Sequence, residues 1–221
     1  MNTKDVWIVT GASRGIGLSI AQRVIANGDC VALLARSDSV YDIAQKLGED
    51  ALGFQTDITD ESAVVATVKK VAAHFGSITR LVNNAGLHRG GRLGKLELSD
   101  WQAVIRTNLD GAMLMSRACE GAMSAGSSIT NIGAVVGFRG FPGDAAYAAS
   151  KAGLAGLTQA LAIEFVLSGR IVPGKTRRVC EGVPLVGQGS GGSEAGLLDA
   201  GNQWLAFPKS IAFSDLGLVD C

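Results

Sequence analysis

The chain has 221 residues, of which 47% are hydrophobic, so it can bury a sizeable core and lacks the composition of a disordered protein. Its 20 Lys and Arg residues equal its 20 Asp and Glu residues in number, and this balance argues against binding to nucleic acid or to anionic membranes, because both need excess positive charge. No apolar run is long enough to cross a bilayer, and the first residues show no signal-peptide pattern.

The four cysteines are scattered along the chain without a CxxC pair. This spacing predicts neither a disulfide framework nor a metal site, and it is typical of proteins in a reducing compartment. We therefore expect a cytoplasmic protein with no bound metal.

Short apolar runs alternate with helical patterns from residue 5 to about residue 170. Near-continuous apolar strands separated by helices predict a parallel sheet that is covered on both faces. The expected fold class is therefore α/β, with a Rossmann-type doubly wound sheet. Strands are predicted over residues 5–10, 30–35, 51–55, 79–82 and 128–132, and helices up to about residue 26, over about 40–47 and 60–75, from 99 onwards, and over about 145–165.

One helix start and the C-terminal segment carry signals of their own. Ser99 followed by Gln102 matches a capping box, which predicts that the long helix opens at Ser99. Beyond Phe165 the strand–helix alternation stops, and residues 182–202 are rich in Gly without apolar periodicity. We expect residues 182–202 to be poorly ordered without a ligand or partner.

A glycine-rich segment, Thr-Gly-Ala-Ser-Arg-Gly-Ile-Gly at residues 10–17, lies where the first strand ends and the first helix begins. Glycines at this point allow a tight turn and let backbone N–H groups approach a pyrophosphate at the helix N-terminus. The segment therefore predicts dinucleotide binding, with the candidate residues Gly11, Ser13, Arg14, Gly15, Ile16 and Gly17.

A second motif, Asn-Asn-Ala-Gly at residues 83–86, directly follows the fourth strand. Ligands of open α/β sheets bind at the carboxyl ends of the strands, so Asn84, Ala85 and Gly86 are candidates to line the adenosine side of the cofactor. Taken alone, the tetrapeptide is also typical of an ordinary turn.

A third motif places Tyr147 and Lys151 four residues apart on one helical face. A cation beside a phenol lowers its pKa from the usual value of about 10, which suits a tyrosine for acid–base catalysis. Alone, such a spacing is common enough to be a surface pair.

Together and in this order, the three motifs resemble the short-chain dehydrogenase/reductase family over about residues 4–169, with the greatest similarity to 3-oxoacyl-acyl-carrier-protein reductases. The resemblance implies hydride transfer between a nicotinamide cofactor and a carbonyl or secondary alcohol, including 3-oxoacyl thioesters. It also implies a homodimer or homotetramer. Residues 1–221 would form one dinucleotide-binding domain, in which residues 1–172 follow the family and residues 173–221 diverge from it.

The resemblance also assigns roles to single residues. Tyr147 would donate a proton to the substrate carbonyl, and Lys151 would bind the nicotinamide ribose and lower the Tyr pKa. Asn108 would hold a water in the proton relay, while Asp57 and Ile58 would contact the adenine. Simpler interpretations are a polar helix residue for Asn108 and a loop or cap residue for Asp57.

Arg36 bears on the choice of cofactor. A carboxylate near the end of the second strand would favour NAD, whereas an arginine accommodates the 2′-phosphate of NADP. The chain has Arg36 there, and Arg14 could add a second cation. We therefore predict NADP(H), although a solvated arginine would give the same sequence.

One position departs from the family pattern. The family's catalytic serine stands thirteen residues before the tyrosine, and that position is Ala134 here. The departure leaves open a non-enzymatic sensor or scaffold that binds the dinucleotide. A halohydrin-dehalogenase-like lyase is opposed by Lys151 and by the intact glycine segment. His88, which follows the second motif, is more typical of a loop residue than of a catalyst.

Overall fold

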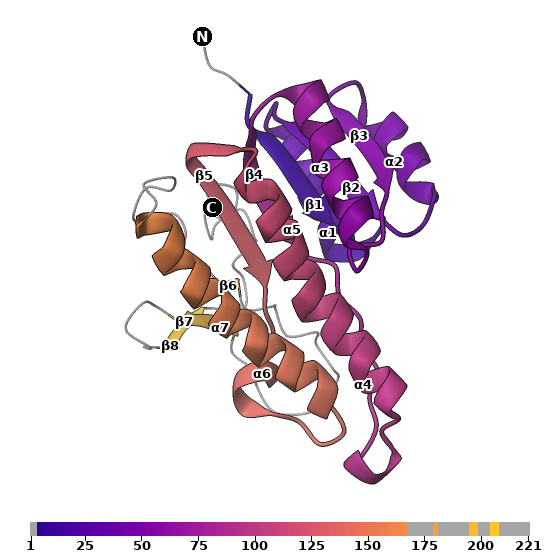
Figure 1. The fold of residues 1–221 in the computed structure, drawn as a ribbon, viewed down its shortest axis with the longest axis vertical. Coiled ribbons are helices and arrows are strands. Elements are labelled where there is room, and N and C mark those ends of the chain that lie inside the picture. The colour runs from indigo at the N-terminus through magenta and orange to yellow at the C-terminus, as the bar shows by residue number, and fades with distance from the viewer. Residues whose placement is uncertain (1–3, 168–178, 181–194, 199–203, 208–221) are drawn as a thin grey trace.

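The computed structural model describes residues 4–167, 179–180, 195–198 and 204–207 (Figure 1). Within them, five parallel strands and their helices alternate as the apolar pattern predicts. The strands of the main sheet are β1 (Val6–Thr10), β2 (Cys30–Ala35), β3 (Ala51–Gln55), β4 (Ile78–Asn83), β5 (Met123–Ile132) and β6 (Val179–Cys180). The helical segments are α1 (Gly15–Ala26), α2 (Ser39–Leu47), α3 (Glu61–Phe75), η1 (Leu93–Lys95), α4 (Leu98–Ile105), η2 (Arg106–Asp110), α5 (Gly111–Glu120), α6 (Val136–Arg139) and α7 (Ala145–Leu167).

The main sheet has the strand order β3-β2-β1-β4-β5-β6, and all its paired strands run parallel. The order reverses between β1 and β4, which is the switch point where a doubly wound sheet binds its ligand. This topology confirms the predicted Rossmann-type fold. No helix among the described residues is both long and apolar enough to cross a membrane.

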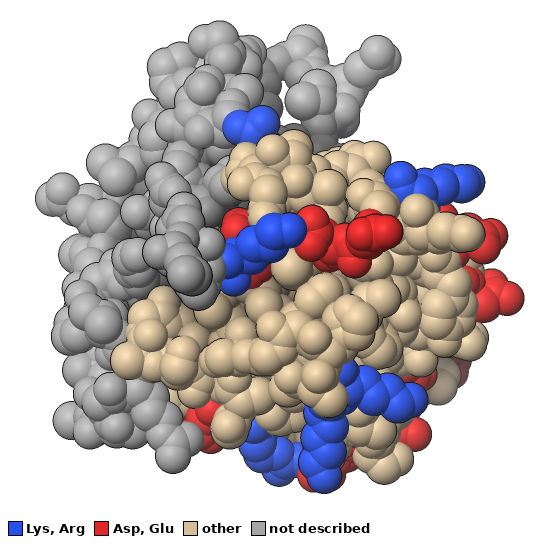
Figure 2. Space-filling model, turned by 90° about the horizontal axis from the view of Figure 1, so that it is seen from above, with Lys and Arg blue, Asp and Glu red and all other residues tan. Residues whose placement is uncertain are grey.

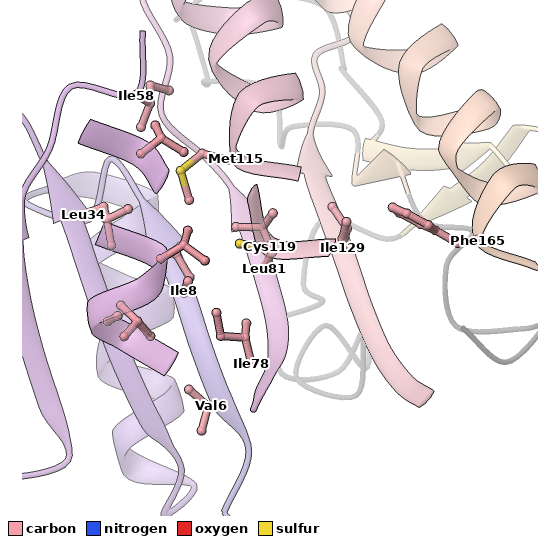
Figure 3. Packing of buried hydrophobic residues seen from close by; sticks show 14 residues of the cluster. Val6, Ile8, Leu34, Ile58, Ile78, Leu81, Met115, Cys119, Ile129 and Phe165 are labelled. Atoms are coloured by element: carbon pink, nitrogen blue, oxygen red, sulfur yellow. The ribbon is translucent and has the colours of Figure 1, made fainter. Parts of the chain in front are cut away.

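Alternation along the strands divides the core between the two faces of the sheet. In β1, Val6 and Ile8 belong to one buried cluster, whereas Trp7 and Val9 belong to another. Figure 3 shows the first cluster, in which side chains of the sheet meet those of α3, α5 and α7. The second cluster packs against α1 and α2. Helices therefore cover both faces, because successive side chains of a strand point to opposite sides.

Helix α3 has the buried face that the sequence predicts, and α4 and α5 form one continuous helix. Val64, Val68 and Val71 of α3 are buried as their spacing predicts, and Asp60 caps this helix by accepting from the backbone N–H groups of Ser62 and Ala63. Helices α4 and α5 run on through η2, a π-helical turn, as one rod in Figure 1.

The predicted capping box at Ser99 is wrong. Helix α4 begins at Leu98 after an extended Glu97, and no side chain caps it. The carbonyl of Glu97 instead accepts from the backbone N–H groups of Asp100 and Trp101. Ser99 is therefore the second residue of the helix and lies past the N-cap position.

The C-terminal segment contains more strand than its composition predicts. The sixth strand is Val179–Cys180, beyond the Pro-Gly at residues 173–174, and pairs with the end of β5. Strands β7 (Ala195–Leu198) and β8 (Trp204–Phe207) form a separate antiparallel pair. The rest of the 182–202 stretch lies outside the described residues, so its predicted disorder stays a prediction.

Candidate active site

A cavity of about 890 Å³ opens at the carboxyl ends of the first strands of the sheet. Most residues predicted to bind the cofactor line it, from the four loops that follow β1, β2, β3 and β4. Gly17 lies behind the loop wall rather than on it, and Tyr147 and Lys151 of α7 are not among the lining residues. The lining residues are Gly11, Ser13, Arg14, Gly15, Ile16, Leu34, Ala35, Arg36, Ser37, Ser39, Thr56, Asp57, Ile58, Asn84, Ala85, Gly86 and Thr107.

The glycine segment has a backbone that few other residues would permit. Gly11 and Gly15 have φ angles of +65° and +57°, a region that glycine enters without strain. A Cβ atom on Gly15 would meet nothing within 4 Å, whereas one on Gly17 would lie 2.5 Å from the carbonyl oxygen of Gly11. The segment is thus open towards the cavity at Gly15 and packed tightly behind it at Gly17.

The N-terminus of α1 meets this cavity. Gly15 and Ile16 line the wall, and the first turn of the helix carries no acidic residue. The first N–H groups of a helix have no partner within it and carry a partial positive charge. A pyrophosphate fits this position, because the open space at Gly15 lets an anion approach those groups.

Asn84 ties the second motif to the glycine segment. Its side-chain Nδ2 donates to the carbonyl oxygens of Thr10 (2.9 Å) and Gly11 (3.3 Å). The Thr10 hydroxyl in turn accepts from the backbone N–H groups of Asn84 and Ala85, each at 3.0 Å. The amide of Asn84 therefore fixes the loop wall, and the motif is more than an isolated turn.

Two arginines give the cavity its charge. Arg14 and Arg36 both line it, and neither forms an ion pair with another residue that the structure describes. Ser37 and Ser39 lie beside Arg36 and hydrogen-bond each other at 2.7 Å. Sequence reasoning missed these serines, although their place next to Arg36 was a usable signal.

Asp57 and Ile58 come from the loop that follows β3. The Asp57 carboxylate accepts from the backbone N–H and the hydroxyl of Thr59, so the acid also makes the local turn. Ile58 is buried and belongs to the core cluster seen in Figure 3, and a Cβ on Gly111 would lie 2.6 Å from its Cδ1. Both residues line the cavity and stabilise its wall.

The predicted Tyr147–Lys151 pair lies on α7. The Lys151 Nζ atom is 5.8 Å from the centre of the Tyr147 ring and donates to the carbonyl oxygen of Ile132 at 2.6 Å. Lys151 is buried, and burial lowers the pKa of its ammonium group to about 8.

The predicted direction of the Tyr147 pKa is wrong for this structure. Burial and the negative charge of Asp144 raise the pKa of the phenol above its ordinary value. Lys151 does not offset them, because its own charge is disfavoured by burial and its Nζ is directed to a main-chain carbonyl. The phenol is therefore protonated at neutral pH.

Asn108 connects the cavity wall to α7. Its Oδ1 accepts from the Leu87 N–H at 2.7 Å, and its Nδ2 donates to the Leu87 carbonyl and to the Ser150 hydroxyl. Ser150 then donates to the Tyr147 carbonyl oxygen at 2.7 Å. Because Leu87 and Asn108 directly follow the cavity residues Gly86 and Thr107, these hydrogen bonds connect the cavity wall to the main chain at Tyr147.

Comparison with known proteins agrees with this arrangement. A family model described as short chain dehydrogenase matches residues 5–173. The chain belongs to this short-chain dehydrogenase family.

Individual members of the family align with most of the chain. The chain is 39% identical over 168 residues to the 3-oxoacyl-[acyl-carrier-protein] reductase FabG of Salmonella typhimurium, which covers 74% of this chain and 68% of the relative. The human 3-oxoacyl-[acyl-carrier-protein] reductase is 39% identical over 162 residues, or 72% of this chain and 68% of the relative. Among solved structures, a blue fluorescent protein from a metagenomic library in complex with NADPH superimposes with a TM-score of 0.72 at 33% identity, covering 78% of this chain and 73% of that one.

Ala134, at the position of the usual family serine, lies two residues after the end of β5. Its carbonyl accepts from the Gly137 N–H at 3.0 Å, closing the turn into α6. A Cβ on Gly137 would lie 2.9 Å from the backbone of Lys151, so this turn packs directly on the helix that carries the Tyr–Lys pair. Ser127 and Ser128 are buried farther back on β5, and a methyl group at position 134 cannot donate a hydrogen bond.

His88 is the residue near the tyrosine that sequence reasoning set aside. Its ring meets the Tyr147 ring edge to face, with 5.1 Å between the ring centres, and its Nε2 lies 2.8 Å from an oxygen of Asp144. The two rings are 59 positions apart in the chain, so only the fold brings them together. In the described part of the chain, no group of three His, Cys, Asp or Glu side chains could hold a metal.

Proposed function

We propose that the chain is an NADP(H)-dependent oxidoreductase that transfers a hydride between the nicotinamide and a carbonyl or secondary alcohol. The observation that carries this proposal is the cavity itself, where the glycine segment, Arg14 and Arg36 come together. The hydrogen bonds through Asn108 and Ser150 then lead from this cavity to the main-chain carbonyl of Tyr147 and so position its helix.

The cavity residues would divide the cofactor among them. The first N–H groups of α1 would hold the pyrophosphate, and Arg36, with Arg14, Ser37 and Ser39, would hold a 2′-phosphate. Asp57 and Ile58 would lie against the adenine, and Asn84–Gly86 would line the adenosine side. When bound, the nicotinamide supplies the hydride.

The residues of α7 would move the proton. Tyr147 would donate from its hydroxyl to the substrate oxygen, which suits a phenol whose pKa is raised by burial and by Asp144. Lys151 would turn its ammonium towards the nicotinamide ribose. A relay water near Asn108 would need the second lone pair of Oδ1 or a main-chain group of η2, because Nδ2 already donates twice.

Ala134 would limit the rate and leave binding intact. It deprives the substrate oxygen of one hydrogen-bond donor, and such a loss costs roughly 100- to 1,000-fold in turnover. The cofactor loops precede β5 in the chain and do not contain this position. We therefore propose that the unmodified chain binds NADPH well but turns over slowly.

The same proposal covers the substrate class, the compartment and the oligomeric state. 3-Oxoacyl thioesters are the first substrates to test, since relatives with 39% identity are named as 3-oxoacyl-[acyl-carrier-protein] reductases. We propose a single domain for residues 1–221 that acts in the cytoplasm as a homodimer or homotetramer. Both signs of charge are interspersed in the view of Figure 2, and neither covers the described surface, which supports a small-molecule substrate over nucleic acid.

The test is NADPH oxidation with a panel of β-ketoesters and ketones, on this chain and on Ala134→Ser. We expect the serine to raise kcat about 100-fold at an unchanged NADPH dissociation constant. Ordinary turnover by the unmodified chain would contradict the role given to the missing hydroxyl.

A dinucleotide-binding sensor or scaffold is the second candidate, and Ala134 is the observation that favours it. If Ala134→Ser binds NADPH normally but stays inactive across the whole panel, this second function is preferred.

A further inference from the structure

A histidine and a carboxylate stand beside the tyrosine on which the proposed reaction depends. The Nε2 atom of His88 lies 2.8 Å from Oδ1 of Asp144, and the His88 ring meets the Tyr147 ring edge to face at 5.1 Å. Because a carboxylate only accepts, Nε2 must carry the hydrogen of this contact. The imidazole thus contacts both the carboxylate of Asp144 and the ring of Tyr147.

The two loops that carry these residues are also joined through their main chains. The Gly91 N–H donates to the Gly143 carbonyl oxygen at 2.7 Å. A Cβ on Gly90 would lie 3.2 Å from the same oxygen and 3.4 Å from both Asp144 Oδ1 and His88 Cε1. The loop after β4 is therefore fitted closely against the segment that precedes α7, and the contact is built by more than two side chains.

The charged surroundings of Tyr147 are few. Among the described residues, three titratable groups interact with Tyr147. They are Lys151 on its own helix, Asp144 before that helix and His88 from the loop after β4. Lys151 donates to Ile132, while the side chain of Asp144 is held by His88. Asp144 is thus the one anion of this set.

We propose that His88 and Asp144 together set how readily Tyr147 releases its proton: Asp144 supplies a fixed negative charge, and His88 is the positioning residue that holds this charge beside the phenol. A phenolate next to a carboxylate is disfavoured, whereas a neutral phenol is not. The pair therefore keeps Tyr147 in the form that can give a proton. In terms of the proposed function, on which this last step rests, it tunes the site towards reduction of a carbonyl rather than oxidation of an alcohol.

The chain offers a direct measurement, because Tyr147 and Tyr41 are its only two tyrosines. In a Tyr41→Phe background, the ionisation of Tyr147 can be followed in the full chain by tyrosinate absorbance or by the NMR signal of a 13Cζ-labelled ring. Neither readout needs a substrate or an active enzyme. The matched variants are Asp144→Asn, which keeps the shape and removes the charge, His88→Gln, which keeps a donor, and His88→Phe, which keeps a ring without a donor.

We expect Asp144→Asn to move the titration of Tyr147 to lower pH. His88→Phe should move it in the same direction, because the freed carboxylate turns to solvent, and His88→Gln should restore the unmodified behaviour. The double variant His88→Phe/Asp144→Asn should shift no further than Asp144→Asn alone. In Ala134→Ser, the same substitutions should move the pH midpoint for alcohol oxidation downwards in parallel.

An unchanged titration in Asp144→Asn would overturn the proposal. An equal shift in His88→Gln and His88→Phe would overturn the positioning role of His88, since loss of the donor would then not be the cause. A loss of thermal stability without any shift would reduce the pair to a structural contact and overturn it too. Expected titration shifts without turnover of any substrate would instead support the pair and count against the proposed oxidoreductase function.

Discussion

The polar residues in the two halves of the sheet differ in what they contact. Around β1, β2 and β3, the candidate residues face a cavity of about 890 Å³, and Arg14 and Arg36 have no ion-pair partner among the described residues. Around β4, β5 and α7, several polar side chains bind one another or the main chain, although the buried Asn83 Oδ1 and Ser128 Oγ have no hydrogen-bond partner among the described residues. The first half therefore offers an open cavity, whereas the second half joins its polar groups through hydrogen bonds.

This contrast lets the effects of substitutions on cofactor binding be separated from their effects on turnover. On the proposed function, the first half is the cofactor half, which keeps the features that dinucleotide binding needs. The second is the reacting half, which has a methyl group at position 134 where the family resemblance implies a serine. We therefore expect substitutions in the first half to change cofactor affinity, and substitutions in the second to change rate or pH behaviour with affinity nearly unchanged.

The largest expected effect is in the reacting half. Tyr147→Phe in the Ala134→Ser background should lower kcat on the order of 1,000-fold, because a positioned general acid contributes about 100- to 10,000-fold. NADPH affinity should change less than about twofold, since the hydroxyl is not part of the described cavity wall. Tyr41→Phe, at the exposed position of the only other tyrosine, is the matched control. A comparable loss in that control would remove the special role of Tyr147.

A second prediction concerns Lys151, whose pKa is lowered from 10.5 to about 8 by burial. Between these two pH values the unfolded chain binds more protons at this residue than the folded chain, so Lys151 makes the free energy of unfolding rise with pH. Relative to Lys151→Met, the gain between pH 8 and 10.5 should be roughly 3 kcal/mol, at 1.36 kcal/mol per unit of pKa.

Denaturant titrations of both proteins across this range measure that difference, and other titrating groups cancel because the two proteins share them. Lys70→Met, at an exposed position of α3, is the control and should show no such rise. A flat difference between the unmodified chain and Lys151→Met would show that the amine of Lys151 is not desolvated.

The cofactor half should be sensitive to a single methyl group. A Cβ on Gly17 would lie 2.5 Å from both the Gly11 carbonyl oxygen and the Asn84 Nδ2, so Gly17→Ala should destabilise the chain by roughly 1–3 kcal/mol through overpacking. It should also weaken NADPH binding more than tenfold. Gly156→Ala in α7 has open space around it, and should stabilise by about 0.5–1 kcal/mol through helix propensity. Thermal unfolding and NADPH titration of both variants separate crowding from propensity.

The smallest expected effect is selective for one cofactor. Arg36→Ala should weaken NADPH binding about tenfold, because a charge-assisted hydrogen bond to a phosphate contributes roughly 1.5–3 kcal/mol before solvent screening. NADH affinity should stay the same, since NADH has no 2′-phosphate. Arg23→Ala, on α1 and away from the cavity wall, serves as the charge-matched control. Equal weakening of NADPH and NADH would place Arg36 outside the 2′-phosphate site.

Local sequence signals were enough for the sheet and for the cofactor half. Strands β1 and β2 are nearly continuous apolar runs, and the glycine segment directly follows the end of β1, so neither signal needs knowledge of distant contacts. The Ser99 cap failed because the Glu97 carbonyl completes the first turn of α4, and the match at Ser99 and Gln102 could not show this.

Contacts between distant segments account for what the sequence could not give. The direction of the Tyr147 pKa depends on burial and on Asp144, and the contact of His88 with Tyr147 depends on two loops that only the fold brings together. Strands β7 and β8 were missed because each has only four residues, which is too short for apolar periodicity to be detected.

The central claim is that the cavity of the first half is an NADPH site that functions whether or not the second half turns over. Its most direct test is titration of the unmodified chain with NADPH and with NADH, with both dissociation constants measured at the same ionic strength. The account predicts saturable binding of both, with NADPH the tighter ligand. Equal affinity, tighter binding of NADH, or no binding of either cofactor by the folded chain would contradict it.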